Sequence, residues 1–263
     1  MDNGNKDRIL SRIREARLID NAFMNAFFDQ NNEAVELILR IIMNDNDLKV
    51  KECRVEKLLK NLEGHDVRLD IFAVDGNGNE INVEIQRSSE GADKKRARYH
   101  SAMLDSHMLP PGCQFDKLKD SYVIFITEND VLKSGKPLYS IERIILNTNE
   151  KFNDGGHIIY VNGADRNNTT ELGKLMHDFF CKDPDDMNYQ ILAKKARELK
   201  STNRGIENME SYLDKWDREN IERNSTEIAM NLIAEGNIPY EVIARATGLP
   251  IETITELARK TAV

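Results

Sequence analysis

Two short runs of alternating apolar and polar residues, joined by glycine and asparagine, constrain the fold of this chain most. Residues 67–75 (VRLDIFAVD) and 80–86 (EINVEIQ) have the period of two that is typical of β-strands, and Gly76-Asn77-Gly78 lies between them. A three-residue loop with glycine at its third, left-handed position is a common hairpin connection. The sequence therefore predicts an antiparallel β-hairpin.

The length of this loop decides whether polar side chains from the two strands meet. With three loop residues, Asp70 lies opposite Glu84, and Gln86 follows two positions further along the same face. A two-residue turn would instead place Asp70 opposite Ile85 and separate the two carboxylates. Directly opposed Cβ atoms are about 4.5–5.5 Å apart, which is close enough for two carboxylates to share one ion. We expect the three-residue loop.

Two adjacent carboxylates on a hairpin repel each other unless something neutralises them. Asp70 and Glu84 offer the oxygen ligands that Mg²⁺ prefers, and this ion usually keeps several waters beside one or two carboxylates. Such an ion can polarise a phosphate and acidify a bound water, so phosphodiester hydrolysis is the natural chemistry of the arrangement. The alternative is a hairpin with one hydrated polar face and no bound ion.

The composition argues against two broad classes of protein. No apolar run in the 263 residues approaches the roughly 20 residues that span a bilayer, so we expect no membrane partner. A formal net charge of -8 argues against a protein that coats nucleic acid, although a local basic run, KKRARYH, lies at residues 94–100. The N-terminus shows no secretory signal and the three cysteines are isolated, so we expect a cytoplasmic location.

The rest of the chain predicts an α/β fold followed by helices. Helical and strand patterns alternate up to about Asp165, and only helical patterns follow it. The expected helices include 8–19, 33–43 and 91–107, and the expected strands besides the hairpin are the start of 48–62, 121–127, 140–146 and 156–162. We therefore expect a mixed central sheet flanked by helices in residues 1–165 and an all-helical extension in residues 166–263.

The extension ends in a pattern typical of a helix-turn-helix unit, at about residues 227–260. Ala244, Gly248 and Ile254 supply the small, turn-permitting and apolar residues that such units need. The second helix is acidic at its start and offers basic residues only late, at Arg259 and Lys260, whereas DNA contacts usually lie near the start of that helix. A structural or dimer-forming role is the favoured interpretation, and DNA reading is the alternative.

Three segments together resemble a known family. "LEGHDVRLDIFAVDGNGNEINVEIQRS", "KKRARYHSAMLD" and "HIIYVNGAD" are similar, in order and spacing, to the recombination-promoting nuclease and PD-(D/E)XK transposase-like proteins of bacteria. The resemblance runs from about Asn25 to Leu199. It implies a restriction-endonuclease-like αβββαβ core and a DNA endonuclease that uses a divalent ion, usually Mg²⁺, with Mn²⁺ as a substitute.

The resemblance also assigns site residues. It implies that Asp70 and Glu84 are catalytic metal ligands and that Glu33, on the first core helix, completes the metal site. Position 86 is Gln where the superfamily usually has lysine. This amide can orient a water or contact phosphate but cannot act as a general base at neutral pH. Metal-bound hydroxide, or a lysine such as Lys95 from the next helix, would then supply the missing function.

The basic helix after the hairpin is the expected DNA contact. Lys95, Arg96 and Tyr99 share one face of this helix near the expected metal, while Arg98 projects elsewhere. Arginine can bind a phosphate through two donors, and Arg87 lies still nearer the acids. The alternative for each residue is a solvated charged face.

Two hypotheses of function remain open at this point. The first is a Mg²⁺-dependent DNA endonuclease related to proteins of mobile elements. The second is a catalytically weak or inactive DNA- or protein-binding module with the same fold, which the glutamine at position 86 and the negative net charge favour. Two coordinated cuts would favour a homodimer, although no residue requires one.

Overall fold

The computed structural model describes residues 3–61, 64–87 and 89–261 and divides the chain into two compact units, Met1–Met209 and Glu210–Val263. The first unit contains a six-stranded sheet in the order β1-β2-β3-β4-β8-β5. Its strands are β1 (Val50–Leu59), β2 (Val67–Asp75), β3 (Glu80–Gln86), β4 (Ser121–Thr127), β5 (Leu138–Ile141) and β8 (Gly156–Asn162). Neighbours from β1 to β3 are antiparallel, β3, β4 and β8 are parallel, and β5 pairs antiparallel with β8. The sheet is therefore mixed, as the sequence predicts.

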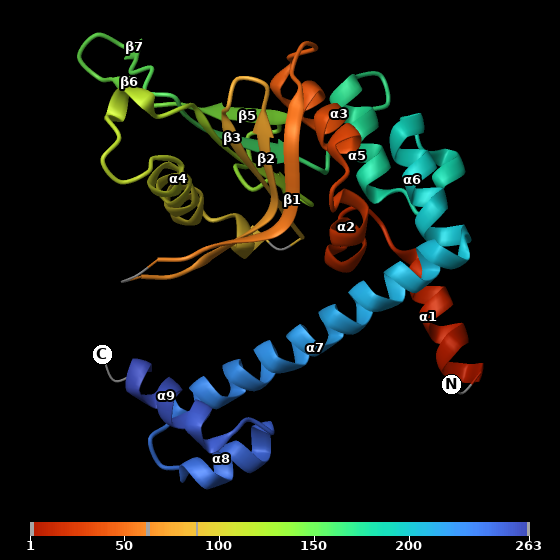
Figure 1. Ribbon diagram of the computed structural model, residues 1–263, viewed down its shortest axis with the longest axis vertical. Coiled ribbons are helices and arrows are strands. Elements are labelled where there is room, and N and C mark those ends of the chain that lie inside the picture. The colour runs from red at the N-terminus through yellow and green to blue at the C-terminus, as the bar shows by residue number, and fades with distance from the viewer. Residues whose placement is uncertain (1–2, 62–63, 88, 262–263) are drawn as a thin grey trace. The chain divides into compact units, whose positions relative to one another are not determined.

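Helices cover both faces of this sheet (Figure 1). One face carries α4 (Lys94–Met108), the crossover between the parallel strands β3 and β4. The other face carries α2 (Asn21–Phe28) and α3 (Asn32–Met43), with α5 (Glu171–Phe180) and α6 (Gln190–Ser201) packed beside them. The run from α3 through β1, β2, β3 and α4 to β4 is the expected αβββαβ core. Burial of apolar side chains between the sheet and the helices stabilises this arrangement.

The β2–β3 hairpin has the register that brings polar residues together. Ile71 pairs with Val83 and Val74 with Glu80, which is the register of the three-residue loop. Gly78 supplies the left-handed position with φ of 87°. The Asp75 carboxylate also accepts hydrogen bonds from the backbone N–H groups of Asn77 in the loop and Asn79 directly after it, at 2.8 and 2.9 Å. The prediction of a three-residue loop is confirmed.

Several expected elements are present in the structure. The strands predicted at 121–127 and 156–162 are β4 and β8, and the start of 48–62 is part of β1. The helix predicted at 33–43 is α3, and most of 91–107 is α4, preceded by the 3-10 turn η1 (Ser89–Ala92). The elements that match at both ends to within one residue are 33–43, 121–127 and 156–162.

Three local expectations are wrong or incomplete. The helix predicted at 8–19 is α1 (Asn3–Glu15), because the Asp20 carboxylate accepts the backbone N–H of Arg17 at 2.9 Å and ends the helical path. Helix α2 was not predicted, since seven of its eight residues are buried and its sequence lacks an amphipathic period.

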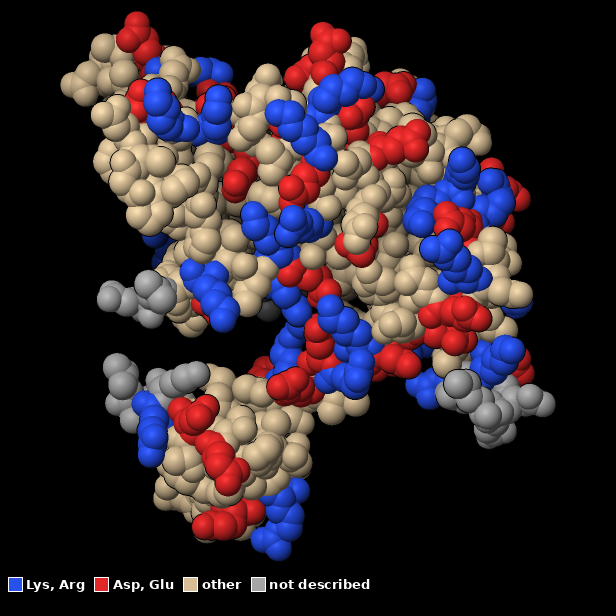
Figure 2. Space-filling view, viewed as in Figure 1, with Lys and Arg blue, Asp and Glu red and all other residues tan. Residues whose placement is uncertain are grey.

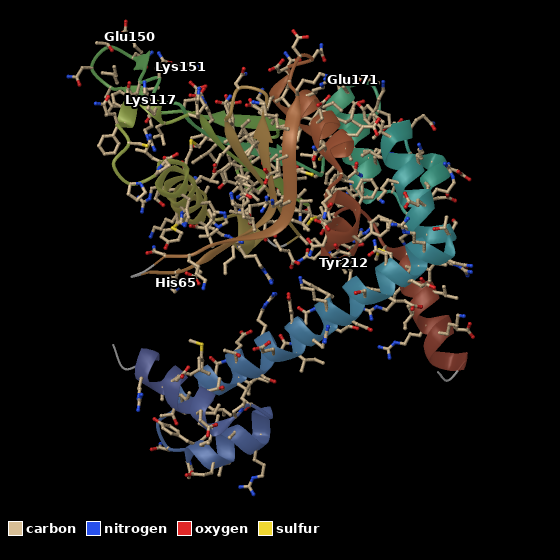
Figure 3. The ribbon with its side chains drawn as sticks, in the orientation of Figure 1. His65, Lys117, Glu150, Lys151, Glu171 and Tyr212 are labelled. Atoms are coloured by element: carbon tan, nitrogen blue, oxygen red, sulfur yellow. The ribbon has the colours of Figure 1, made fainter. Side chains whose placement is uncertain are left out.

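The strand predicted at 140–146 is divided in two. Its start belongs to β5, and β6 (Ile144–Ile145) pairs instead with β7 (Glu150–Lys151) in a separate two-stranded sheet. Glu150 and Lys151 lie in this arm, away from the central sheet (Figure 3). The chain therefore leaves the central sheet after β5 and turns back on itself between β6 and β7, so the predicted single strand does not form.

The second unit is helical. It contains the later part of α7 (Asn203–Ala234) together with α8 (Tyr240–Thr247) and α9 (Ile251–Thr261). Ala229, Ile243 and Ile254 form its buried core, and Gly248 ends α8 with φ of 73°. The last strand of the chain ends at Asn162, whereas the division between compact units follows Met209. Of the helices described, none combines the length and apolar character needed to cross a membrane.

Candidate metal centre and its polar network

The candidate site lies where the backbone pairing between β2 and β3 stops. The last pair in this ladder is Ile71 with Val83. Beyond it, the backbone N–H of Asp70 donates to Glu84 Oε1 at 3.3 Å, and the backbone N–H of Ile85 donates to Asp70 Oδ2 at 2.8 Å. Each carboxylate thus accepts a hydrogen bond from a backbone N–H of the opposite strand. It takes the place of the backbone carbonyl that would accept this bond if the ladder continued. The two side chains that the sequence predicts to meet lie together here.

Glu84 is fully buried and is surrounded by hydrogen-bond donors. Asn82 Nδ2 donates to Glu84 Oε1 at 3.0 Å, and a guanidinium nitrogen of Arg96 donates to Glu84 Oε2 at 3.1 Å. His100 Nδ1 lies 3.5 Å from Glu84 Oε1. A buried carboxylate is stable only when its oxygens are paired in this way, so the network accounts for the charge at this position.

The two carboxyl groups have opposite pKa shifts. Burial, followed by the nearby charge of Glu84, raises the pKa of Asp70 to about 8, although the Ile85 N–H and Arg96 partly oppose the rise. Burial alone would also raise the pKa of Glu84, but its contacts with His100, Arg96 and Asn82 outweigh burial and lower it. At neutral pH and without a metal, the proton therefore resides on Asp70 and the negative charge on Glu84.

The donor set fits a hard divalent cation. Asp70 and Glu84 are neighbouring buried carboxyl groups, and burial beside the charge of Glu84 raises the pKa of Asp70, so a cation there would relieve the repulsion between them. Mg²⁺ is commonly bound by one or two carboxylates with waters in its remaining positions. In the part of the chain that the structure describes, no group of three or more His, Cys, Asp or Glu side chains is placed to hold one ion.

Glu33 is not brought to this pair. It lies exposed in the first turn of α3, and the neighbouring Asn32 donates to the backbone carbonyl of Lys51 near the start of β1. Asp70 instead lies in β2 opposite the later part of β1, between the pairs Val55 with Ile71 and Lys57 with Leu69. A role for Glu33 as a third ligand requires a change of position on metal binding and stays a prediction.

Gln86, the last residue of β3, lies half-buried beside the 3-10 turn η1. A Cβ atom at Gly91 in that turn would overlap the Gln86 side-chain amide. Glycine at position 91 therefore leaves the space that the amide occupies. Since Gln86 follows Glu84 by two residues, the strand alternation directs both side chains to the same side of β3.

The predicted DNA-binding residues separate into two groups. Arg96 is directed to Glu84, whereas the Tyr99 hydroxyl donates to the His65 carbonyl at 2.7 Å and accepts a hydrogen bond from Asn61. His65 lies at the end of the β1–β2 pair (Figure 3), so Tyr99 holds that end to α4. Lys95 and Arg98 are exposed.

Arg87 follows β3 and joins a separate ion-pair cluster. Its guanidinium lies 3.2 Å from Asp20 Oδ1 and 3.5 Å from Glu128 Oε2. Asp20 also pairs with Arg17. Arg87 is more than half exposed, so these contacts leave it accessible, but it does not contact Asp70 or Glu84 through any hydrogen bond that the described residues show.

Two residues of the network, Asn82 and His100, are absent from the predicted site. Both are buried, and both contact Glu84. A signal for each exists in the sequence: Asn82 precedes Glu84 by two residues on the same strand face, and His100 follows Arg96 by one helical turn. Neither signal distinguishes a site residue from an ordinary polar neighbour before the helix is placed on the sheet.

Comparison with known proteins supports the resemblance found in the sequence. A family model described as PD-(D/E)XK nuclease family transposase matches residues 17–225. No curated protein and no solved structure matches the chain significantly. The matched segment includes α2 through most of α7, with both carboxylates of the candidate site and the basic helix α4. The chain therefore belongs to the PD-(D/E)XK nuclease family transposases.

Proposed function

We propose that this protein is a divalent-metal-dependent DNA endonuclease that hydrolyses phosphodiester bonds, with Mg²⁺ as the metal and Mn²⁺ as a substitute. The observation that carries the proposal is the pair of Asp70 and Glu84 at the end of the β2–β3 ladder. One member of the pair keeps a proton in the absence of metal because two buried negative charges are unfavourable there. Membership of a nuclease family supports a nucleic-acid substrate.

The residues around the pair have distinct proposed roles. Asp70 and Glu84 would hold the ion, which on binding supplies Lewis-acid polarisation of the phosphate and lowers the pKa of water. Arg96, within reach of Glu84, would contact the phosphate of the substrate through its remaining donors. Gln86 would orient the attacking water or a phosphate oxygen, since an amide can donate and accept but cannot remove a proton at neutral pH.

The charge distribution favours local DNA contacts over a broad basic surface. Figure 2 shows Lys and Arg interspersed with Asp and Glu on the visible face, without an extended area of one sign. The exposed residues Lys95 and Arg98 on α4, together with Arg87 after β3, are the proposed contacts to DNA phosphates. Binding through a few phosphates predicts a moderate dependence of affinity on salt.

A second function is supported by one observation. Gln86 stands where a catalytic lysine is usual in the superfamily, so a nuclease fold that binds DNA or protein without cutting is the alternative. The two functions share the fold and the proposed DNA contacts. They differ in whether a metal ion bound at Asp70 and Glu84 leads to cleavage.

Cleavage of supercoiled plasmid tests the proposal. We expect wild-type protein with Mg²⁺ or Mn²⁺ to nick or linearise the plasmid, and EDTA to stop the reaction. Asp70→Asn should abolish cleavage while keeping the fold, because the amide oxygen can still accept the Ile85 N–H. Asp116→Asn is the matched control, since Asp116 is exposed and pairs only with the adjacent Lys117 among the contacts described.

The outcomes separate the two functions. Cleavage that persists in purified Asp70→Asn would refute the assignment of the site. Absence of cleavage by folded wild type with any metal, over a panel of plasmid and linear DNA, would favour the inactive binding module. The ratio of nicked to linear product in the active case reports whether two cuts are coordinated, as a homodimer would allow.

A further inference from the structure

His100 is a buried residue of α4 whose polar contacts all belong to the candidate site. Its side chain is 5% exposed. Nδ1 lies 3.5 Å from Glu84 Oε1 and 3.2 Å from Asn82 Nδ2, and Arg96 Nε donates to Nε2 at 3.3 Å. The ring thus contacts both the proposed metal ligand Glu84 and the proposed phosphate contact Arg96, which also pair directly with each other.

The contacts favour one tautomer of the ring. Arg96 Nε can only donate, so His100 Nε2 must be unprotonated to accept its hydrogen bond. The proton of the neutral ring is then on Nδ1, where it faces the carboxylate oxygen Glu84 Oε1. The opposite tautomer would direct Nε2–H at the Arg96 donor and a lone pair at Glu84. In that opposite form Nδ1 could accept from Asn82 Nδ2, but the Arg96 donor would have no acceptor on the ring, so the Nδ1–H form is the one that serves both Arg96 and Glu84.

Asn82 shares the acceptor Glu84 Oε1 with His100. Its Nδ2 points to Glu84 Oε1, and its Oδ1 is buried without a hydrogen-bond partner among the described residues. A buried amide oxygen without a partner is unfavourable. The amide is therefore oriented by the carboxylate. Glu84 Oε1 is the common acceptor of Asn82 and His100, while Oε2 pairs with Arg96.

We propose that His100 is a positioning residue of the reaction, which joins Glu84 to Arg96 so that the metal ligand and the phosphate contact are held as one unit. This inference rests on the proposed function. Nδ1–H fixes one oxygen of Glu84, and Nε2 fixes the guanidinium of Arg96 through Nε. Arg96 Nη2 donates to the other oxygen of Glu84, which leaves Nη1 for an oxyanion. His100 itself contacts neither metal nor substrate.

Three substitutions at position 100 separate the two links. In His100→Asn, the side-chain amide can replace Nδ1 and donate to Glu84, but it is too short to reach Arg96. In His100→Gln, the longer amide can replace Nε2 and accept from Arg96, but it leaves the Glu84 link unmade. His100→Leu removes both links and keeps an apolar side chain in the buried position.

The measurements are Mn²⁺ binding by calorimetry without DNA, and KM and kcat with Mn²⁺ and a DNA substrate. We expect His100→Leu and His100→Gln to weaken Mn²⁺ binding roughly 10- to 100-fold, the usual effect of removing a group that orients a metal ligand. His100→Asn should restore most of the affinity for Mn²⁺. It should raise KM for DNA, because Arg96 then keeps only its contact with Glu84 Oε2, whereas His100→Gln should mainly lower kcat.

Tyr160→Phe is the control for loss of stability alone. Tyr160 donates to the Ala92 carbonyl at 3.0 Å within the core cluster that packs on α4, and the described hydrogen bonds do not join it to Glu84, Arg96 or His100. This substitution should lower the free energy of unfolding and leave Mn²⁺ affinity within about twofold of wild type. Nitrogen-15 NMR of the metal-free protein adds a direct test, with the proton of the neutral His100 ring expected on Nδ1.

Each outcome bears on the inference. Unchanged Mn²⁺ affinity in His100→Leu, or a proton found on Nε2, would overturn the positioning role while leaving the proposed function intact. Equal losses in the Asn and Gln variants would reduce the role to packing and would also overturn it. A folded wild type that binds no Mn²⁺ would overturn the proposed function together with this inference.

Discussion

Asp70 carries the pH dependence of the site. Because its pKa is raised to about 8, a metal ion must displace a proton at neutral pH. We expect Mn²⁺ affinity to rise as pH increases from 6 towards 8 and to change little above that range. Calorimetry in buffers of different ionisation enthalpy should detect release of about one proton per ion at pH 6.5. Proton release that is absent at this pH would contradict the raised pKa.

The same shift predicts how stability without metal depends on pH. A carboxyl group whose pKa is higher in the folded state than in the unfolded state binds its proton more tightly when the protein is folded. The free energy of unfolding therefore falls as pH rises from the unfolded-state pKa to the folded-state pKa. The loss is at most about 1.4 kcal/mol per pH unit for one group. Asp70→Asn should remove this slope between pH 5 and 8 in urea denaturation with EDTA. A wild-type slope equal to that of the variant would contradict the prediction.

A substitution at Gly91 should displace the Gln86 side chain without unfolding the protein. A methyl group at position 91 would overlap the Gln86 amide, which is the flexible end of its side chain and can move aside. Gly91→Ala should therefore lower the cleavage rate several-fold and change the unfolding midpoint little. Gly112→Ala provides a comparison in which the new methyl meets no atom nearby but the backbone is strained, with φ of 84°. Equal cleavage rates in Gly91→Ala and wild type would argue against a role for the position of Gln86.

At the scale of elements, the hairpin shows how far local pattern determines structure. Strand alternation and one loop of glycine and asparagine were sufficient to predict the register that brings Asp70 to Glu84. The network around Glu84 was not predictable in the same way. His100 reaches Glu84 only because α4 packs across the sheet, and that placement depends on tertiary contacts that no single segment encodes.

The loop that sets this register makes its own prediction. Gly78 has φ of 87°, so Gly78→Ala should destabilise the protein by about 1–2 kcal/mol in urea denaturation. Gly76→Ala is the matched comparison in the same loop, because φ there is not positive and the new methyl would lie 3.7 Å from Lys49 Cβ. We expect Gly76→Ala to be nearly neutral. Similar losses in both variants would mean that strain at position 78 is not what selects glycine.

At the scale of the whole molecule, the two compact units predict separate roles. The second unit has its own small core, so Ile254→Asp should unfold it by placing a charge in that core. Mn²⁺ affinity should stay within about twofold of wild type, since Asp70 and Glu84 belong to the first unit. Circular dichroism and calorimetry on the same sample provide the measurement. A large loss of Mn²⁺ binding would contradict the independence of the two units.

At the end of the β2–β3 ladder, two backbone N–H groups donate to side-chain carboxylates and can therefore report whether the site holds a metal ion. The amides of Asp70 and Ile85 depend on the same two carboxylates that would hold the metal. Their rates of exchange with deuterated solvent should therefore change when the site fills, before any DNA is present and independently of turnover. The exchange rates of these two peptide amides would then measure the fraction of protein with metal bound, without a substrate or an activity assay.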